Sequence, residues 1–166
     1  MRWIGPALRF ALVSLAAYAL LLAWRTPYTA AVCLLSNPLL RVVAGAGHAI
    51  DWSSKGISVG MGEGRVELGA PFLLVAWPLY LGLCAVRPRV ALARPGKVFA
   101  GLGLLLALQV FTLLVLSLRY VWGGGHPALG LVKALGLLLV GGQHVMPPAA
   151  WWLQFSSEFA RRPRGT

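Results

Sequence analysis

The sequence predicts an all-α polytopic membrane protein with four transmembrane helices, plus an extracytoplasmic amphipathic helix and a short β-hairpin between the first and second spans. Of its 166 residues, 58% are apolar and only 11% are charged, whereas soluble domains carry about 25% charged residues. Several apolar runs approach the roughly 20 residues that a span needs. The 15 Lys and Arg outnumber the 4 Asp and Glu and flank these runs. That distribution follows the positive-inside rule and argues against a nucleic-acid surface. We therefore expect one membrane domain over residues 1–166.

The first span is expected over residues 5–24, after the basic residues Arg2 and Arg9. A secretory signal peptide is the alternative, because a basic start precedes the apolar run and small residues follow it. The run is long for a signal peptide and ends at Arg25. We therefore favour an uncleaved span.

Residues 26–69 are expected to form an extracytoplasmic segment. Within it, apolar residues recur at helical spacing over about 28–46, so that this stretch either spans the bilayer or lies along its interface. Alternating residues on both sides of a glycine-rich turn then predict a hairpin over about 56–69. Such a hairpin is marginal alone, so it should lean on the membrane, the helix or a partner.

Three clearer spans follow, over residues 70–86, 98–118 and 131–155. Residues 98–118 form the strongest apolar run, and Pro147-Pro148 should kink the last span. The connections are a basic cytoplasmic loop at 87–97, an outer turn at 119–130 and a basic cytoplasmic tail at 156–166.

Loop charge decides whether residues 28–46 cross the membrane. If they do not, the 87–97 loop, the tail and the basic start all lie in the cytoplasm, and the nearly neutral 26–69 segment faces out. If they do, the most basic loop and the tail lie outside, against the positive-inside rule. We therefore expect four spans in a bacterial inner membrane, with both termini cytoplasmic.

Five polar residues are candidates for a functional role, although the pattern assigns no catalytic, cofactor-binding or metal-binding residue. Intramembrane polar groups are costly and tend to face a protein interior. Gln143 and His144 in the last span and Gln109 in the third fit that description. For Gln143-His144 the interpretations are an interhelical hydrogen bond or a functional role as a haem or metal ligand or a proton relay. Glu63 and Glu67 belong to the hairpin, where a solvated surface is the simplest interpretation.

A catalytic interpretation would use Cys33 as a nucleophile, or Asp51 and Glu63 as acid–base groups. No local signature accompanies them, and the clear spans contain no Asp or Glu before Glu158. Cys33 and Cys84 make no CxxC pair or metal-ligand spacing, and we expect both to pack as small apolar residues. The sequence therefore favours a protein that is not an enzyme and needs no cofactor.

Several local features together resemble a known family. The chain opens MRWIGPALRFAL, carries Pro78-Leu-Tyr80-Leu-Gly82-Leu83, and places Gln143, Pro147-Pro148, Trp151-Trp152 and Phe159 in or just after its last span. This layout resembles the exosortase H-associated membrane proteins of bacterial inner membranes. His144 departs from it, because the family has an aromatic or small residue there.

The resemblance implies an accessory role beside an exosortase, a membrane enzyme of protein sorting. Cys33 is followed by Leu-Leu-Ser-Asn-Pro, which is unlike the surroundings of that enzyme's cysteine. The leading hypothesis is thus a non-catalytic accessory protein that contacts the lipid bilayer and docks an exosortase-like partner through its outward segment. The alternative is an anchor subunit of a redox complex that uses His144 for haem or quinone.

Overall fold

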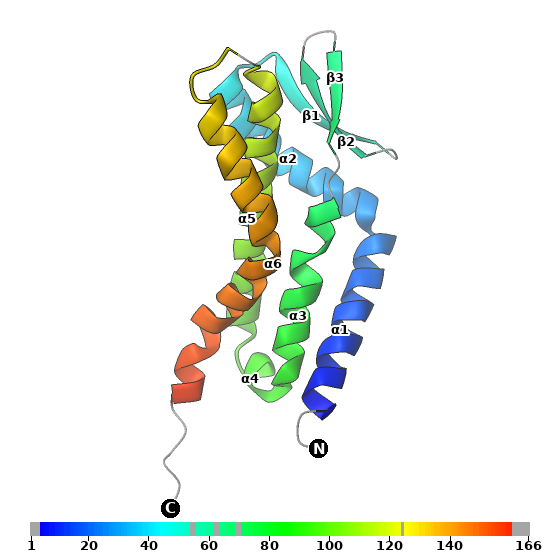
Figure 1. Ribbon diagram of the computed structural model, residues 1–166. Helices are drawn as coiled ribbons and strands as arrows, with labels where there is room; N and C mark the ends of the chain where they lie inside the picture. The colour runs from blue at the N-terminus through cyan, green and yellow to red at the C-terminus, as the bar shows by residue number, and fades with distance from the viewer. Residues whose placement is uncertain (1–3, 54–55, 62–63, 69–70, 124, 161–166) are drawn as a thin grey trace, which may run out of the picture. The chain divides into compact units, whose positions relative to one another are not determined.

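The computed structural model describes residues 4–53, 56–61, 64–68, 71–123 and 125–160. The described chain is mostly helical and adds one small antiparallel sheet (Figure 1). Within it, four helices are long and apolar enough to cross a membrane: α1 (Ile4–Ala23), α2 (Arg25–Ala44), α5 (Pro95–Val121) and α6 (Leu129–Ala160). This architecture confirms the predicted fold class, and the chain is a membrane protein.

The segment predicted as a span over 70–86 is not one continuous helix. A 3-10 turn, η1 (Pro71–Leu74), precedes the 11-residue helix α3 (Ala76–Val86). Pro78 occupies the third position of α3, where a missing N–H costs no helical hydrogen bond. The short helix α4 (Pro88–Leu92) then leads to α5. That residues 71–86 cross the membrane in place of α2 remains a prediction from the nearly neutral charge of residues 26–69.

The predicted hairpin is part of a three-stranded meander in the order β1-β2-β3. Its strands are β1 (His48–Ser53), β2 (Gly56–Met61) and β3 (Gly64–Leu68). In the register, Ile50 pairs with Val59, which pairs with Val66. Sequence patterning predicted β2 and β3 but not β1, which lies between the expected helix over about 28–46 and the expected hairpin over about 56–69.

The chain divides into two compact units, and α5 and α6 each contribute to both. The first unit comprises residues 1–22, 74–105 and 143–166, and its core gathers around Tyr80, Leu105 and Phe155. The second comprises residues 23–73 and 106–142, and its core joins α2, the sheet and α5 around Val32, Ile50 and Leu113.

Candidate functional site

The three-stranded sheet has one apolar face and one polar face. Successive strand residues point to opposite sides, and four apolar side chains of one side are buried in the second unit's core: Ile50, Ile57, Val59 and Leu68. Trp52, on the same side, is 39% exposed. Figure 1 shows the sheet beside α2, which belongs to the same unit. The sheet therefore gains from α2 and α5 the apolar cover that it lacks alone.

The opposite side, here called the outer face, combines a central strand of small residues with charged residues on the flanking strands. In the register, Ser58 lies between Asp51 and Glu67, and Gly60 lies between Ala49 and Arg65. Because the middle strand carries only small side chains on this face, Arg65 reaches past it to Asp51, with 3.8 Å between Nη2 and Oδ2. Both side chains stay largely in solvent, at 73% and 50% exposure. The result is a surface with the Ser58 hydroxyl on its middle strand and charged groups at its rim.

A side chain from α2 fixes the position of the sheet. The Asn37 side-chain amide donates to the Ile50 carbonyl at 2.9 Å and accepts from the Ile50 N–H at 2.7 Å. These two bonds copy the pairing that a neighbouring strand would give to β1. The asparagine that interrupts the apolar stretch of α2 is therefore a structural clamp, here called the Asn37 clamp.

Gln109, one of the predicted polar residues, is fully buried in α5 and joins two other segments of the second unit. Its Oε1 accepts from the Tyr28 hydroxyl of α2, and its Nε2 donates to the Leu73 carbonyl at 2.8 Å. Ser36 adds to this region, because its hydroxyl donates to the Val32 carbonyl at 2.8 Å and lies 3.4 Å from the Val110 carbonyl. These bonds give Gln109 a structural role, as polar residues between packed membrane helices often have.

The predicted pair Gln143-His144 is split between the interior and the surface of the first unit. Gln143 is fully buried, whereas the His144 side chain is exposed. Both residues lie one helical turn before prolines that sit inside α6, so their carbonyls lose the N–H donors of Pro147 and Pro148. The sequence predicted that both Gln143 and His144 face a protein interior, but only Gln143 is buried.

The acidic and sulfur-containing candidates do not come together. Glu67 is exposed in β3, and Glu63 lies outside the described residues. Cys33 has no exposed surface within the second unit's core, and Cys84 is buried in the first. A nucleophile at Cys33 would need a substrate to enter that packed core.

The residues described hold no group of three His, Cys, Asp or Glu placed to bind a metal ion. His126, the other histidine near a long helix, stacks on Trp122 with 4.1 Å between ring centroids. Its Nδ1 accepts from the Ala128 N–H at 3.2 Å. These contacts fix the ring within its turn.

A second polar cluster, in the first unit, was not anticipated from the sequence. The Gln154 side-chain amide fits its neighbours when Nε2 faces the Tyr80 hydroxyl at 2.5 Å and the Lys97 carbonyl at 2.8 Å, and Oε1 accepts from the Gly101 N–H at 2.9 Å. The Lys97 ammonium donates to the Gln154 carbonyl at 2.6 Å and lies 5.7 Å from the Phe155 ring centroid. This cluster joins α3, α5 and α6.

Gly101 makes that cluster possible. A Cβ at this position would lie 2.0 Å from the Tyr80 hydroxyl oxygen, closer than any non-bonded atoms approach. Glycine therefore lets α3 come near α5, in the way that small residues do between membrane helices. In the sequence, Gly101 is followed by Leu102 and Gly103, and such paired small residues indicate close helix packing without identifying the partner.

No protein-family model, curated protein or solved structure matches this chain. The resemblance to exosortase H-associated proteins therefore stays a prediction from the residues that suggested it. Two of those residues have clear structural roles, because Tyr80 is buried in the polar cluster and Gly82 packs against α1.

Proposed function

We propose that this chain is a non-catalytic accessory protein of a bacterial inner membrane that docks a partner through the outer face of its sheet. Both termini lie in the cytoplasm and the sheet lies outside the cell membrane. The partner is an exosortase-type sorting enzyme, as the family resemblance implies.

The polar outer face is the observation that carries this proposal. A three-stranded sheet is stabilised by burial of an apolar face, and here the apolar side packs in the core of the second unit. The opposite side presents backbone, small residues and charges in a fixed register. A surface held rigidly, with Asp51, Arg65 and Glu67 at its rim, suits recognition of another protein, because charged rims set orientation and specificity.

Burial of the candidate nucleophile favours docking over catalysis. Cys33 packs with Val32 and Leu40 in the core, whereas catalytic cysteines occupy electropositive and partly exposed positions. Asp51, an acid of the sheet that a catalytic interpretation would use, forms an ion pair with Arg65 on the surface.

The experiment is co-purification from detergent with a co-expressed exosortase-type enzyme, comparing Gly60→Arg with Gly60→Ala. A Cβ at Gly60 would lie 3.6 Å from the Ala49 carbonyl oxygen, an ordinary contact, so both variants are expected to fold. The arginine covers the middle of the outer face and should reduce recovery of the enzyme at least about tenfold, which corresponds to about 1.4 kcal/mol of binding. The alanine variant should retain recovery near that of the wild type.

Equal recovery with Gly60→Arg and Gly60→Ala would show that the outer face is not the docking surface. Failure of the wild-type protein to recover the enzyme at all would remove the partner class instead.

A further inference from the structure

An apolar groove of about 320 Å³ lies in the first unit, where α3, α4 and α5 meet. Every residue that lines it is apolar, including Cys84 and Ala85 of α3, Ala91 and Leu92 of α4, and Val98 and Phe99 of α5. Its volume falls in the lower part of the range found for small-molecule sites, about 300–1,000 Å³. An apolar chain is the ligand chemistry that such walls favour.

The groove opens to the surroundings of the protein. Leu92 is 79% exposed and Phe99 is 71% exposed, so two large apolar side chains at its margin lie uncovered by this chain. The loop that contains α4 joins two segments that the sequence places in the membrane, residues 70–86 and 98–118. The groove therefore meets the bilayer near its surface.

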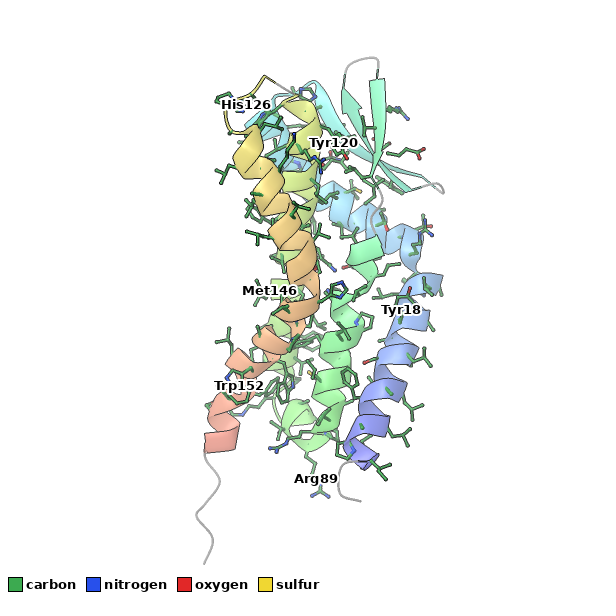
Figure 2. The ribbon with its side chains drawn as sticks, in the orientation of Figure 1. Tyr18, Arg89, Tyr120, His126, Met146 and Trp152 are labelled. Carbon is green, nitrogen blue, oxygen red and sulfur yellow. The ribbon has the colours of Figure 1, made fainter. Side chains whose placement is uncertain are left out.

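Three arginines stand next to lining residues of the groove in the sequence. Arg87 and Arg89 flank Pro88, and Arg94 precedes Pro95, and both prolines line the groove. All three arginine side chains are exposed, and Figure 2 shows Arg89 extending away from α4. Lys97 is directed elsewhere, because its ammonium bonds the Gln154 carbonyl. These three residues, here called the basic margin, carry guanidinium groups, which bind phosphate through paired N–H donors.

We infer that this groove is a binding site for one anionic phospholipid, with an acyl chain against the apolar walls and the phosphate headgroup on Arg87, Arg89 and Arg94. Apolar walls and a basic margin are complementary to the two parts of such a lipid. Basic pockets beside membrane helices on the cytoplasmic side bind anionic headgroups in this manner. This inference does not depend on the proposed docking function, because it concerns other residues of the chain.

Native mass spectrometry of the full-length protein in detergent tests the site. The protein is titrated with phosphatidylglycerol and, separately, with phosphatidylcholine of the same acyl chains. Each basic residue near a membrane surface contributes roughly a fivefold gain in affinity for anionic lipid, so three contribute about 100-fold. The wild type should hold phosphatidylglycerol at least about tenfold more tightly than phosphatidylcholine.

The variant Arg87→Gln/Arg89→Gln/Arg94→Gln should lose about 100-fold in affinity for phosphatidylglycerol, and Arg89→Gln alone about fivefold. The matched control is Arg161→Gln/Arg162→Gln/Arg164→Gln, which removes the same charge from the same predicted side of the membrane. It should change the affinity less than fivefold. The variant Leu92→Gln/Phe99→Gln should weaken phosphatidylglycerol binding about tenfold, because it removes apolar contact from the groove.

Equal wild-type affinity for the two lipids would overturn the inference. An equal loss in the loop and tail variants would do so as well, because it would show general attraction between the basic protein and an acidic lipid. If the triple loop variant does not fold, Arg89→Gln and Leu92→Gln/Phe99→Gln replace it. Unchanged affinity for phosphatidylglycerol in both would overturn the inference.

Discussion

Helices α1 and α2 are each 20 residues long and lie next to each other in the chain, yet α1 buries none of its described side chains and α2 buries four. The α2 side chains Tyr28, Ser36 and Asn37 all reach hydrogen-bond partners elsewhere in the second unit. In α1, the close approach of Phe10 and Ser14 to Gly82 of α3 is the main contact that the structure defines. The two helices are alike in length, but only α2 has buried side chains and side chains that hydrogen-bond to other elements of its unit.

This difference teaches that length and apolar character do not decide which helix crosses the membrane. Both helices qualify as spans by these criteria. The exposed apolar side chains of α1, such as Leu12 and Leu15, suit lipid or a membrane partner, whereas α2 bonds to the sheet. Residues 71–86 cover about 25 Å as a 3-10 turn and a helix, somewhat less than the roughly 30 Å hydrocarbon core. The location of the sheet therefore distinguishes the two arrangements.

The largest expected effect concerns the side of the membrane on which the sheet lies. In a background without Cys33 and Cys84, a membrane-impermeant thiol reagent applied to intact cells should label cysteines introduced at Gly62 and Gly124, and leave one at Ala93 unlabelled. The reason is that residues 26–69 carry as many acidic as basic residues, so the positive-inside rule leaves this segment outside, with residues 71–86 across the bilayer.

The cysteine at Gly62 is the decisive one. If α2 crosses and residues 71–86 do not, the positions 93 and 124 keep their sides and only 62 moves to the cytoplasm. Protection at 62 with labelling at 124 would contradict both the predicted topology and an outward docking surface. A reporter fused to the C-terminus should be active in the cytoplasm in either arrangement.

The second effect tests the link between α2 and the sheet. Asn37→Ala removes both hydrogen bonds of the Asn37 clamp and should lower the free energy of unfolding by about 2 kcal/mol, at about 1 kcal/mol for each bond. The Ile50 amide should also lose protection in hydrogen exchange. Leu34→Ala is the control, because Leu34 is exposed on the same helix. Unchanged protection at Ile50 would show that the clamp does not hold the strand.

The third effect tests the contact of α1 with Gly82 of α3. A Cβ at Gly82 would lie 2.0 Å from the Ser14 hydroxyl oxygen and 3.0 Å from the Phe10 carbonyl oxygen. Gly82→Ala should therefore separate α1 from α3 and destabilise the protein by about 1–3 kcal/mol in unfolding measurements. Gly103→Ala is the matched control, since no heavy atom lies within 4 Å of its Cβ position. It should leave stability unchanged or raise it by up to about 1 kcal/mol. Equal effects of the two alanines would mean that α1 does not pack at Gly82.

The smallest effect concerns Ser14 itself. Its hydroxyl is buried and makes no hydrogen bond with the described residues, so Ser14→Ala should change the free energy of unfolding by less than about 0.5 kcal/mol. Combined with Gly82→Ala, it should recover part of the lost stability, because the closest atom is removed. A large loss from Ser14→Ala alone would indicate a bonded role for this hydroxyl.

The helices could be predicted from the sequence because their signal is local. The apolar runs predicted over 98–118 and 131–155 lie inside α5 and α6, and alternation identified β2 and β3. The first strand, which begins just after the expected helix over about 28–46, was missed although His48, Ile50 and Trp52 also alternate with their neighbours. The break at Gly45 has a positive φ of 97°, which glycine adopts readily, and it ends α2 before β1.

The candidate site was harder to predict, because its bonds join residues far apart in the chain. Burial of Gln109 and Gln143 followed from their place in apolar runs. The Asn37 clamp and the contacts of Gln154 with Tyr80 depend on which helices become neighbours, and neither period nor composition carries that information. The groove beside Arg87–Arg94 likewise forms only when α3, α4 and α5 pack together.

The Asn37 clamp also bears on how the chain avoids aggregation. An open strand edge invites pairing with other chains, and Asn37 occupies the backbone groups of Ile50 that face away from β2. Since α2 precedes β1, the cap is synthesised before the strand that it protects. Each newly made copy thus carries its own block against edge-to-edge association on that side, ready before the sheet is complete.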